Sequence, residues 1–297
     1  MHIHHISNCP LCGKQEFEER FTCRDYYATG ETFHLYECKE CHFLFTQDFP
    51  SQTSIDKYYC AENYISHSDT QRGLVNKLYH IVRRFMLKRK SALVEKHSKG
   101  KRLLDIGTGT GYFAQAMKQK GWEVTAIEKS PQARVFAQKH FGLKIDAPEL
   151  LDSYETGYFN VITLWQVLEH IEDLPQMWER LKEILHEEGT LILALPNPSS
   201  YDANHYKQNW AAYDVPRHLW HFTPATLAKW ASLYGFTVKK QIPMPFDAFY
   251  ISMLSEKNES KTFSTLRGFW RGFLAWIATR RNASLSSSII YILKKQQ

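Results

Sequence analysis

Apolar and polar positions follow two alternating patterns along residues 100–255. Short apolar runs predict buried strands, and the intervening segments, with apolar positions three and four residues apart, predict amphipathic helices. The predicted strands are Arg102–Ile106, Glu123–Glu128, Leu143–Asp146, Phe159–Trp165, Thr190–Leu195 and Phe236–Gln241. The predicted helices are Tyr112–Lys120, Pro131–Phe141, Leu174–His186 and the segment from Thr223 to Gly235. Strands that alternate with short helical crossovers predict an α/β fold, a parallel sheet with helices on both faces.

The chain has a different pattern on each side of this α/β region. Residues 1–48 are rich in Cys and His and contain short β-like pieces, which predicts a small N-terminal domain. Residues 49–99 form a connector that holds Tyr58, Tyr59 and Tyr64 and ends in a predicted helix, Leu74–Lys96. Residues 256–297 form a basic, aromatic tail. We therefore expect four zones, with boundaries at residues 48, 99 and 255.

Positive charge is concentrated in the tail. Residues 256–297 hold eight Lys/Arg and two Asp/Glu, which accounts for the whole formal net charge of +6. A surface that binds nucleic acid normally spreads over the working domain, so this distribution disfavours nucleic acid as a partner. The hydrophobic content of 43% is that of a globular protein, and the sequence shows no membrane-spanning run and no secretory signal. We therefore expect a cytoplasmic protein with reduced thiols.

A glycine-rich segment, Leu103-Leu-Asp-Ile-Gly-Thr-Gly-Thr-Gly-Tyr112, joins the first predicted strand to the first predicted helix. Ligands of parallel sheets bind at such carboxyl ends of strands, and glycines let the backbone approach them closely. The spacing does not fit a dinucleotide fingerprint, because the third glycine of that fingerprint would fall at Tyr112. Asp105, ahead of the glycines, disfavours a pyrophosphate and suits a cationic amino-acid group. Glu128, at the end of the second strand, can accept both hydroxyls of a ribose.

These features resemble the class I S-adenosylmethionine-dependent methyltransferases, which have a Rossmann-like fold. Two later segments resemble the fourth and fifth strands of that family: Phe159-Asn-Val-Ile-Thr-Leu-Trp-Gln-Val-Leu-Glu-His170 and Gly189-Thr-Leu-Ile-Leu-Ala-Leu-Pro-Asn-Pro198. The resemblance covers about residues 100–255 and implies S-adenosylmethionine as the cofactor. The residues that it implies for cofactor binding are Asp105, Gly107, Thr108, Gly109, Gly111, Tyr112, Glu128 and Gln166. Simple helix packing explains Gly111 and Tyr112 equally well.

Two Cys-x-x-Cys pairs lie in the N-terminal zone, Cys9/Cys12 and Cys38/Cys41, with 25 residues between them. Four thiolates at such spacing predict a tetrahedral Zn²⁺ site in a zinc-ribbon-like domain, and a metal-free pair of β-turns is the alternative. A site with four thiolates has no open coordination position, so we expect this zinc to be structural. Cys23 and Cys60 have no partner motif, and we expect both to be buried apolar residues.

A long segment, Tyr201–Phe222, separates the fifth predicted strand from the helix at Thr223. Its length and its aromatic rings and histidines predict a functional or mobile lid over a polar, partly planar substrate. The run Pro216-Arg-His-Leu-Trp-His-Phe-Thr223 resembles the Glu-His-Leu-x-x-Phe stretch of the sugar C-methyltransferases, in which the histidine serves acid/base chemistry. Arg217 replaces the acid, so the resemblance reaches His218 only. Those enzymes share the zinc knuckles but also carry a further C-terminal α/β domain, for which this chain is too short.

Methyl transfer to a hydroxyl or a carbon acid requires a base that removes the acceptor's proton. Histidine has a suitable pKa, and we predict His218 as the first candidate, followed by His221 and His170. A structural role at the turn after the fourth strand is the alternative for His170. Arg217 could bind an acidic group of the substrate or pair with Asp214.

The tail carries one more pattern. Apolar residues recur at spacings of three and four, which predicts an amphipathic helix flanked by arginines: Phe263, Leu266, Trp270, Phe273 and Ile277. Basic residues beside Trp and Phe suit an anionic membrane surface, and a lipid-linked acceptor would follow. The alternative is packing on the chain itself or on a second copy in a homodimer. Gly268 and Gly272 favour this alternative, because they weaken an isolated helix.

We interpret the sequence as a methyltransferase that acts on a small-molecule acceptor, by O- or C-methylation of a sugar, a lipid-linked compound or another metabolite. The second hypothesis is an RNA or protein methyltransferase that grips its target with the zinc knuckle. Against it, residues 1–48 have no excess of Lys/Arg over Asp/Glu. The intact glycine loop disfavours a non-catalytic cofactor-binding module, and the glycine spacing disfavours a nicotinamide enzyme.

Overall fold

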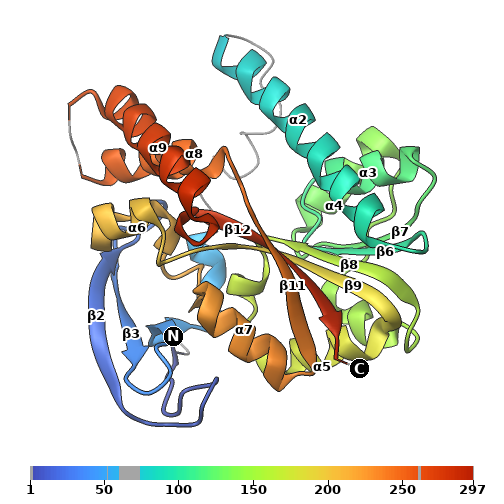
Figure 1. Cartoon of the computed structure of the whole chain (residues 1–297), viewed down its shortest axis with the longest axis horizontal. Helices are drawn as coiled ribbons and strands as arrows, with labels where there is room; N and C mark the ends of the chain where they lie inside the picture. Colours follow the sequence, from blue (N-terminus) through green and yellow to red (C-terminus); the bar gives the residue numbers. More distant parts are fainter. Residues whose placement is uncertain (1–2, 52, 60–73, 260–261, 297) are drawn as a thin grey trace. The chain divides into compact units, whose positions relative to one another are not determined.

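A computed structural model of the chain describes residues 3–51, 53–59, 74–259 and 262–296 (Figure 1). The chain divides into two compact units. Unit 1 comprises Met1–Ala61, Gln166–Pro175 and Ala194–Tyr291, and unit 2 comprises Glu62–Trp165, Gln176–Leu193 and Ile292–Gln297. Cys60, expected to be buried, and Tyr64 of the connector lie outside the described residues.

A six-stranded sheet with the strand order β11-β12-β9-β8-β6-β7 confirms the predicted α/β fold. Its strands are β6 (Arg102–Ile106), β7 (Glu123–Ile127), β8 (Phe159–Trp165), β9 (Leu185–Pro196), β11 (Phe236–Pro243) and β12 (Ser288–Lys295). The pairs β6–β7 and β6–β8 are parallel, and Leu104 lies opposite Thr125 in one pair and Ile162 in the other. Helices flank the sheet: α2 (Leu74–His97), α3 (Tyr112–Gln119), α4 (Pro131–Phe141), α5 (Leu174–Ile184) and α7 (Pro224–Leu233).

In unit 2, the strand order changes direction at β6, because β7 pairs with one side of β6 and β8 with the other. Parallel sheets bind ligands at such a switch point, outside the carboxyl ends of the strands. The helix after β7 begins at Pro131, as the sequence predicts. Ser130 is the N-cap of α4, and its hydroxyl accepts from the Ala133 N–H. The alanines let α3 and α4 pack closely on this edge, in a buried cluster that two larger side chains complete: Ala114, Ala126, Ala137, Leu143 and Ile145.

One predicted strand is absent, and one predicted boundary between a helix and a strand is wrong by several residues. Leu143–Asp146 is not a strand, because only Asp146 forms a bridge, with Ile127, while Leu143 and Ile145 fill the core beside α3. The predicted helix Leu174–His186 ends at Ile184, and β9 begins at Leu185 rather than Thr190. Apolar periodicity cannot separate a buried helix end from a buried strand start, and Leu185 is fully buried.

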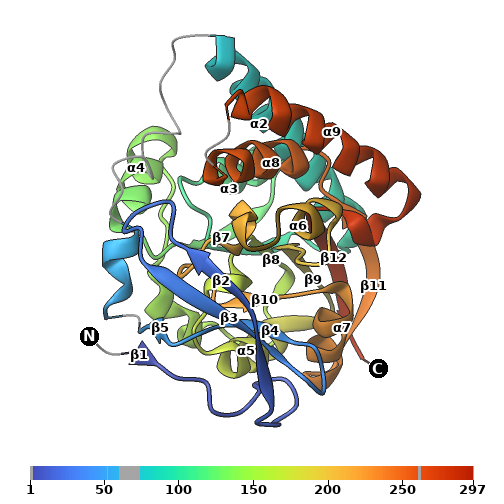
Figure 2. The same ribbon diagram turned by 90° about the vertical axis from the view of Figure 1, so that its left-hand side faces the viewer.

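Unit 1 contains a four-stranded antiparallel sheet with the order β10-β4-β3-β2. Its strands are β2 (Phe17–Arg24), β3 (Thr32–Cys38), β4 (Leu44–Gln47) and β10 (Trp220–His221), and a smaller sheet pairs β1 (Ile3–His4) with β5 (Phe49–Pro50). Figure 2 shows β2, β3, β4 and β10 side by side. In the β10–β4 pair, Trp220 lies opposite Phe45. The N-terminal zone is therefore completed by a strand from residues far along the chain.

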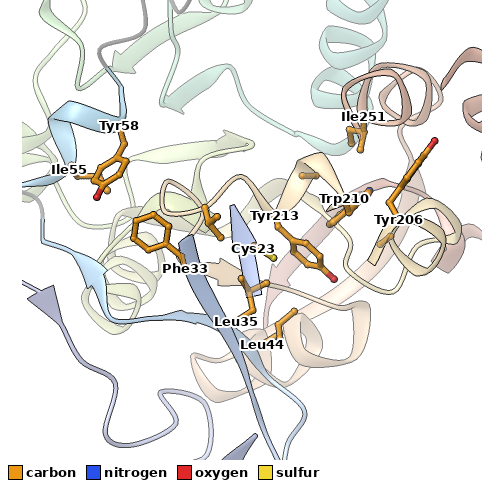
Figure 3. Close-up of a cluster of buried hydrophobic side chains, with 13 residues drawn as sticks. Cys23, Phe33, Leu35, Leu44, Ile55, Tyr58, Tyr206, Trp210, Tyr213 and Ile251 are labelled. Atoms are coloured by element: carbon orange, nitrogen blue, oxygen red, sulfur yellow. The ribbon is translucent and has the colours of Figure 1, made fainter. Parts of the chain in front are cut away.

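The segment Tyr201–Phe222 is a folded part of the core, which corrects the prediction of a lid. It forms α6 (Tyr201–Tyr206), the short 3₁₀ helices η4 (Lys207–Asn209) and η5 (Ala211–Tyr213), and β10. Tyr206, Trp210 and Tyr213 are at most 3% exposed and belong to one cluster with Leu35 of β3 (Figure 3). Aromatic rings bury large apolar areas, and here they fill the space between the N-terminal sheet and the helices of unit 1.

Helices α8 (Asp247–Asn258) and α9 (Ser264–Arg281) lie side by side in both views of the ribbon (Figures 1 and 2). Two glycines of α9 face α8. A Cβ at Gly268 would lie 2.5 Å from the Met253 Cα, and one at Gly272 would lie 2.6 Å from the Phe249 Cα. The two glycines therefore permit the close approach to α8, as expected for a tail held by tertiary contacts. Two residues of the predicted apolar stripe lie at the surface: Leu266 is 71% exposed and Trp270 is 59% exposed.

The last strand, β12, also differs from the expectation of a helical tail. Residues Ile289–Leu293 are at most 1% exposed and lie inside the six-stranded sheet, next to β9 and β11. A five-residue apolar run carries no local sign of its distant strand partners, so its place in the sheet does not follow from the sequence pattern. In the part of the chain that the structure describes, no helix combines the length and the hydropathy needed to cross a membrane.

Candidate functional site

The glycine loop of unit 2 adopts a course that only glycine accepts easily. Gly107, Gly109 and Gly111 have φ angles of 71°, 57° and 82°, all in the left-handed region. Gly111 also packs: a Cβ there would lie 3.1 Å from the Ala137 Cβ. The ring of Tyr112 packs against Phe141, and its centroid lies 3.8 Å from the guanidinium carbon of Arg83. Packing thus accounts for Gly111 and Tyr112, and their contact with a cofactor stays a prediction.

Glu128 holds the glycine loop from the end of β7. Its Oε2 accepts from the Gly109 N–H at 2.8 Å, and its Oε1 accepts from the Ser130 N–H at 2.8 Å. Each carboxylate oxygen can accept a second hydrogen bond, so the side chain still has capacity for ribose hydroxyls. The sequence predicts the acid at this position but not its bond to the loop.

Asp105 lies beneath the loop, 1% exposed, at the carboxyl end of β6. Its Oδ1 accepts from the Thr163 hydroxyl of β8 at 2.6 Å. Burial raises the pKa of Asp105 to about 6, although the hydrogen bond from Thr163 opposes the rise. The residue therefore ties β6 to β8 where the loop begins.

Gln166, the remaining predicted cofactor residue, belongs to unit 1. It has a φ of 59°, and its amide donates to the Asp247 carboxylate at 2.9 Å. Its role in cofactor binding stays a prediction.

The four cysteines of the two Cys-x-x-Cys pairs come together in unit 1, with their sulfurs within 4.8 Å of one another. The Sγ–Sγ distances are 3.5 Å for both Cys9–Cys41 and Cys12–Cys38. Tetrahedral zinc with bonds of about 2.3 Å separates its sulfurs by about 3.8 Å, so the arrangement fits Zn²⁺. These cysteines form no disulfide.

The two cysteine knuckles have the same backbone geometry. The Cys9 carbonyl accepts from the Gly13 N–H at 2.7 Å, and the Cys38 carbonyl accepts from the His42 N–H at 2.9 Å. Gly13 and His42 both have left-handed φ angles, of 74° and 60°. Each knuckle thus makes the same tight turn, which aims its two sulfurs at one point.

Arg217 is the centre of a buried ionic network in unit 1. Its side chain is 3% exposed, and its Nη2 lies 3.0 Å from Asp25 and 2.6 Å from Asp214. Its Nη1 donates to the Tyr58 carbonyl at 2.9 Å. Burial alone would raise the pKa of Asp25, but backbone N–H donors, led by Thr29, and the positive charge of Arg217 lower it. The sequence suggests a pair with Asp214 but not one with Asp25, whose turn shows no sign of its distant partner.

His170 and His218 lie beside this network, with ring centroids 4.5 Å apart. The His170 Nδ1 is 2.8 Å from the Arg217 carbonyl, and the His218 Nδ1 is 2.8 Å from the Ala212 carbonyl. A carbonyl only accepts, so both Nδ1 atoms carry the proton and both Nε2 atoms keep the lone pair of a neutral ring. Burial lowers the pKa of His170 to about 3 and also lowers that of His218, although Asp214 opposes the second shift. Burial therefore favours the neutral form of both rings.

Glu169 completes the group, although the sequence pattern alone does not indicate it as a site residue. It is 1% exposed, and burial raises its pKa to about 8. Neither carboxyl oxygen has a hydrogen-bond partner among the described residues. One of these oxygens and one nitrogen from each ring of His170 and His218 lie within 4.8 Å of one another. We call these three residues the Glu–His–His cluster.

His221 is not part of that cluster. It lies in β10, 4% exposed, with its Nε2 3.2 Å from the Thr46 hydroxyl and its ring against Tyr213. Burial lowers its pKa well below the usual value. Through these contacts His221 joins β10 to β4. Its catalytic role stays a prediction.

Known proteins resemble this chain over its α/β region. The sequence model of a family described as a methyltransferase domain matches residues 78–241. The ubiquinone biosynthesis O-methyltransferase of Xanthomonas oryzae pv. oryzae (strain PXO99A) is 30% identical over 145 residues, 44% of this chain and 60% of that protein. The chain thus spans about 60% of the length of this relative. The protein of the same name from Xanthomonas axonopodis pv. citri (strain 306) is 27% identical over 63% of this chain and 82% of its own length.

Solved structures with a similar fold include a SAM-dependent methyltransferase from Archaeoglobus fulgidus. It is 18% identical, covers 72% of this chain and 94% of its own, and has a TM-score of 0.49.

The buried network gives a stability prediction. Replacing Arg217 with Met leaves the carboxylate of Asp25, whose side chain is fully buried, without its cation, so we expect the free energy of unfolding to fall by about 3–5 kcal/mol. Adding Asp25→Asn should recover part of this loss. Urea unfolding measures both variants. Lys99→Met, which removes an exposed ion pair with Glu188, is the control and should cost less than about 1 kcal/mol. An equally small effect for Arg217→Met would contradict the prediction.

Proposed function

Because the chain belongs to the methyltransferase-domain family, we propose that it transfers a methyl group from S-adenosylmethionine to a small-molecule acceptor. The observation that carries the proposal is the glycine loop at the switch point of the sheet, with its Gly109 N–H bound by Glu128. A loop that presents backbone groups beside a ribose-binding acid suits a nucleoside with an amino-acid arm. The name of the relatives, ubiquinone biosynthesis O-methyltransferase, supports a hydroxyl group as the methyl acceptor.

The proposed reaction is an in-line displacement at a methyl group on sulfur. The acceptor hydroxyl gives its proton to a base, and the electron pair left on oxygen forms the new bond to the methyl carbon. The carbon–sulfur bond breaks, its electron pair stays on sulfur, and S-adenosylhomocysteine leaves. For a carbon acid the same steps apply to a C–H bond.

The proposed base is His218, with His170 as its neighbour. Both rings are neutral and keep an Nε2 lone pair, which is the state that a base requires. His218 retains 12% side-chain exposure, and we propose that a small acceptor approaches it from there. His221 is the weaker candidate, because its Nε2 already faces the Thr46 hydroxyl.

We further propose that the four cysteines bind a structural Zn²⁺. The support is the matched pair of knuckles and the 3.5 Å sulfur spacing. A site of four thiolates leaves no position for substrate, so this zinc stabilises the sheet of unit 1 and takes no part in the reaction. Nothing in the described residues of this sheet favours a nucleic-acid partner over a small molecule.

The hairpin of α8 and α9 supports a lipid-linked acceptor. On α9, Leu266, Phe269 and Trp270 are all more than half exposed, and Tyr250 on α8 is 59% exposed. Helix α8 packs against the glycine face of α9, so the described part of the chain leaves these apolar side chains at the surface. Arg267 lies among them with 50% side-chain exposure, and Arg280 is exposed further along. Aromatic and basic side chains on one helix match an anionic membrane surface, which we propose as the partner of this face.

Cofactor binding tests the proposed function. Glu128→Ala removes the acid that holds Gly109 and that would accept the ribose hydroxyls, so affinity for S-adenosylmethionine should fall by about 10-fold or more. Titration calorimetry measures this change, with Glu149→Ala, an exposed acid of the same unit, as the unchanged control. Binding of NAD without any response to S-adenosylmethionine would overturn the proposal.

The zinc site has its own test. Cobalt bound in place of zinc should give the charge-transfer absorption of metal thiolates, and Cys38→Ser should abolish this absorption by removing one of the four ligands. Cys23→Ala, a buried cysteine outside the cluster, is the matched control and should keep it. If wild-type protein purified without chelator contains no zinc and shows no such absorption with cobalt, the site is metal-free.

Vesicle sedimentation tests the membrane-facing helix. The wild-type chain should pellet with anionic phospholipid vesicles at low salt, and Leu266→Ser/Trp270→Ser should leave it in the supernatant, because apolar insertion is lost. Val135→Ser/Leu233→Ser removes two other exposed apolar side chains and should not change binding. If the wild-type and both variants stay in the supernatant, the exposed face has another partner.

A further inference from the structure

Glu169 is a carboxyl group that unit 1 buries without a hydrogen-bond partner among the described residues. Its side chain follows β8 in the short helix η3 (Leu168–His170) and is 1% exposed. Buried polar groups in folded proteins are nearly always hydrogen-bonded, because an unpaired one is strongly unfavourable. The buried carboxyl of Glu169 therefore needs an explanation, which we sought among the residues around it.

The polar groups that lie close to the Glu169 carboxyl include the two histidines of the Glu–His–His cluster. His170 is adjacent in sequence, and His218 is brought beside Glu169 by main-chain pairing, since the Leu219 N–H donates to the Glu169 carbonyl at 2.8 Å. Neither ring uses its Nε2 to bond Glu169, because neither oxygen of that carboxyl is bonded within the described residues. Three potential metal-ligand atoms thus converge within 4.8 Å without bonding to one another.

Both imidazoles are oriented in the way that metal ligands are. A metal-binding histidine usually donates its second ring N–H to a carbonyl or carboxylate, which fixes the ring and leaves the other nitrogen for the metal. Here the Nδ1 of His170 faces the Arg217 carbonyl and that of His218 faces the Ala212 carbonyl. The three ligand atoms lie within 4.8 Å of one another, and ligands around one zinc ion are about 3.4 Å apart.

We propose that Glu169, His170 and His218 bind a second metal ion, a divalent cation of the Zn²⁺ type, in addition to the ion of the four cysteines. Two nitrogens and one carboxylate oxygen are the ligand set of open zinc sites, which keep a further position for substrate or water. The inference rests on the proposed function: the open position would take the hydroxyl oxygen of the acceptor. His170 and His218 are each partly exposed.

A cation at this place changes how the acceptor loses its proton. The ion held by these residues would make the acceptor's hydroxyl more acidic, so that the proton would pass to solvent water and the oxygen would keep the electron pair that forms the bond to the methyl carbon. His218 then acts as a ligand rather than as the base itself. The carbon–sulfur bond breaks as before, with its electron pair on sulfur.

Cobalt titration of the metal-free full-length chain counts the two ions separately. We expect two equivalents to bind: one with thiolate charge-transfer absorption, and one with visible cobalt absorption but no thiolate band, since its ligands are nitrogen and oxygen. Glu169→Gln and His218→Gln should each lose only the second equivalent. His221→Gln, a buried histidine of the same unit outside the cluster, should keep both.

The number of cobalt equivalents that the wild-type chain binds tests the proposed second site even if a variant fails to fold. One equivalent, with thiolate absorption alone, overturns the second site and returns His218 to the role of a direct base. S-adenosylmethionine binding is measured on the same samples. It should be unchanged in Glu169→Gln, and its absence from the wild-type chain would instead refute the proposed function while leaving the metal count interpretable.

Discussion

The guanidinium of Arg217 joins three parts of unit 1 that lie far apart in the sequence. It contacts Asp25 in the turn after β2, the Tyr58 carbonyl in the segment that follows the N-terminal sheet, and Asp214 at the end of η5. A buried ion pair stabilises a protein only when its charges are fully compensated, and here two carboxylates and a carbonyl surround one cation. The neighbouring carbonyl of Arg217 orients His170, and His218 follows Arg217 directly. The geometry of the Glu–His–His cluster therefore depends on this interaction.

The same network joins the N-terminal zone to later segments of unit 1. Its sheet takes its last strand, β10, from the segment after α6, and its hydrophobic cluster includes Trp210 and Tyr213 of that segment. The cysteine cluster joins the two knuckles at the end of β3, while Arg217 holds the turn at Asp25. Buried aromatic residues, the ion pair and the proposed structural metal thus stabilise one body, and the polar residues proposed for the reaction are attached to it.

Local patterns in the sequence are sufficient for the α/β class, for the cap of α4 by Ser130, and for the meeting of the four cysteines. They fail where distant segments decide the structure. β12 is an apolar run whose neighbours in the sheet, β9 and β11, precede it by many residues. Its pattern alone therefore does not show that it is a strand of the sheet and not part of the helical tail. The aromatic residues of Tyr201–Phe222 suggest a lid in the sequence. Most of them are buried instead, against residues of β3 and β4, and the local sequence does not show these partners. In the site, motifs predict His170 and His218, but Glu169 and Asp25 show their importance only through burial and through partners far along the chain.

Product analysis tests whether this chain methylates a small molecule. The full-length chain is incubated with S-adenosylmethionine carrying an isotopically labelled methyl group and with pools of small hydroxyl compounds, with and without an isoprenoid chain, alongside RNA and protein. We expect a labelled small-molecule product, with one S-adenosylhomocysteine formed for each labelled methyl group. Label found only in RNA or protein, or bound cofactor that transfers no methyl group to any pool, would contradict it.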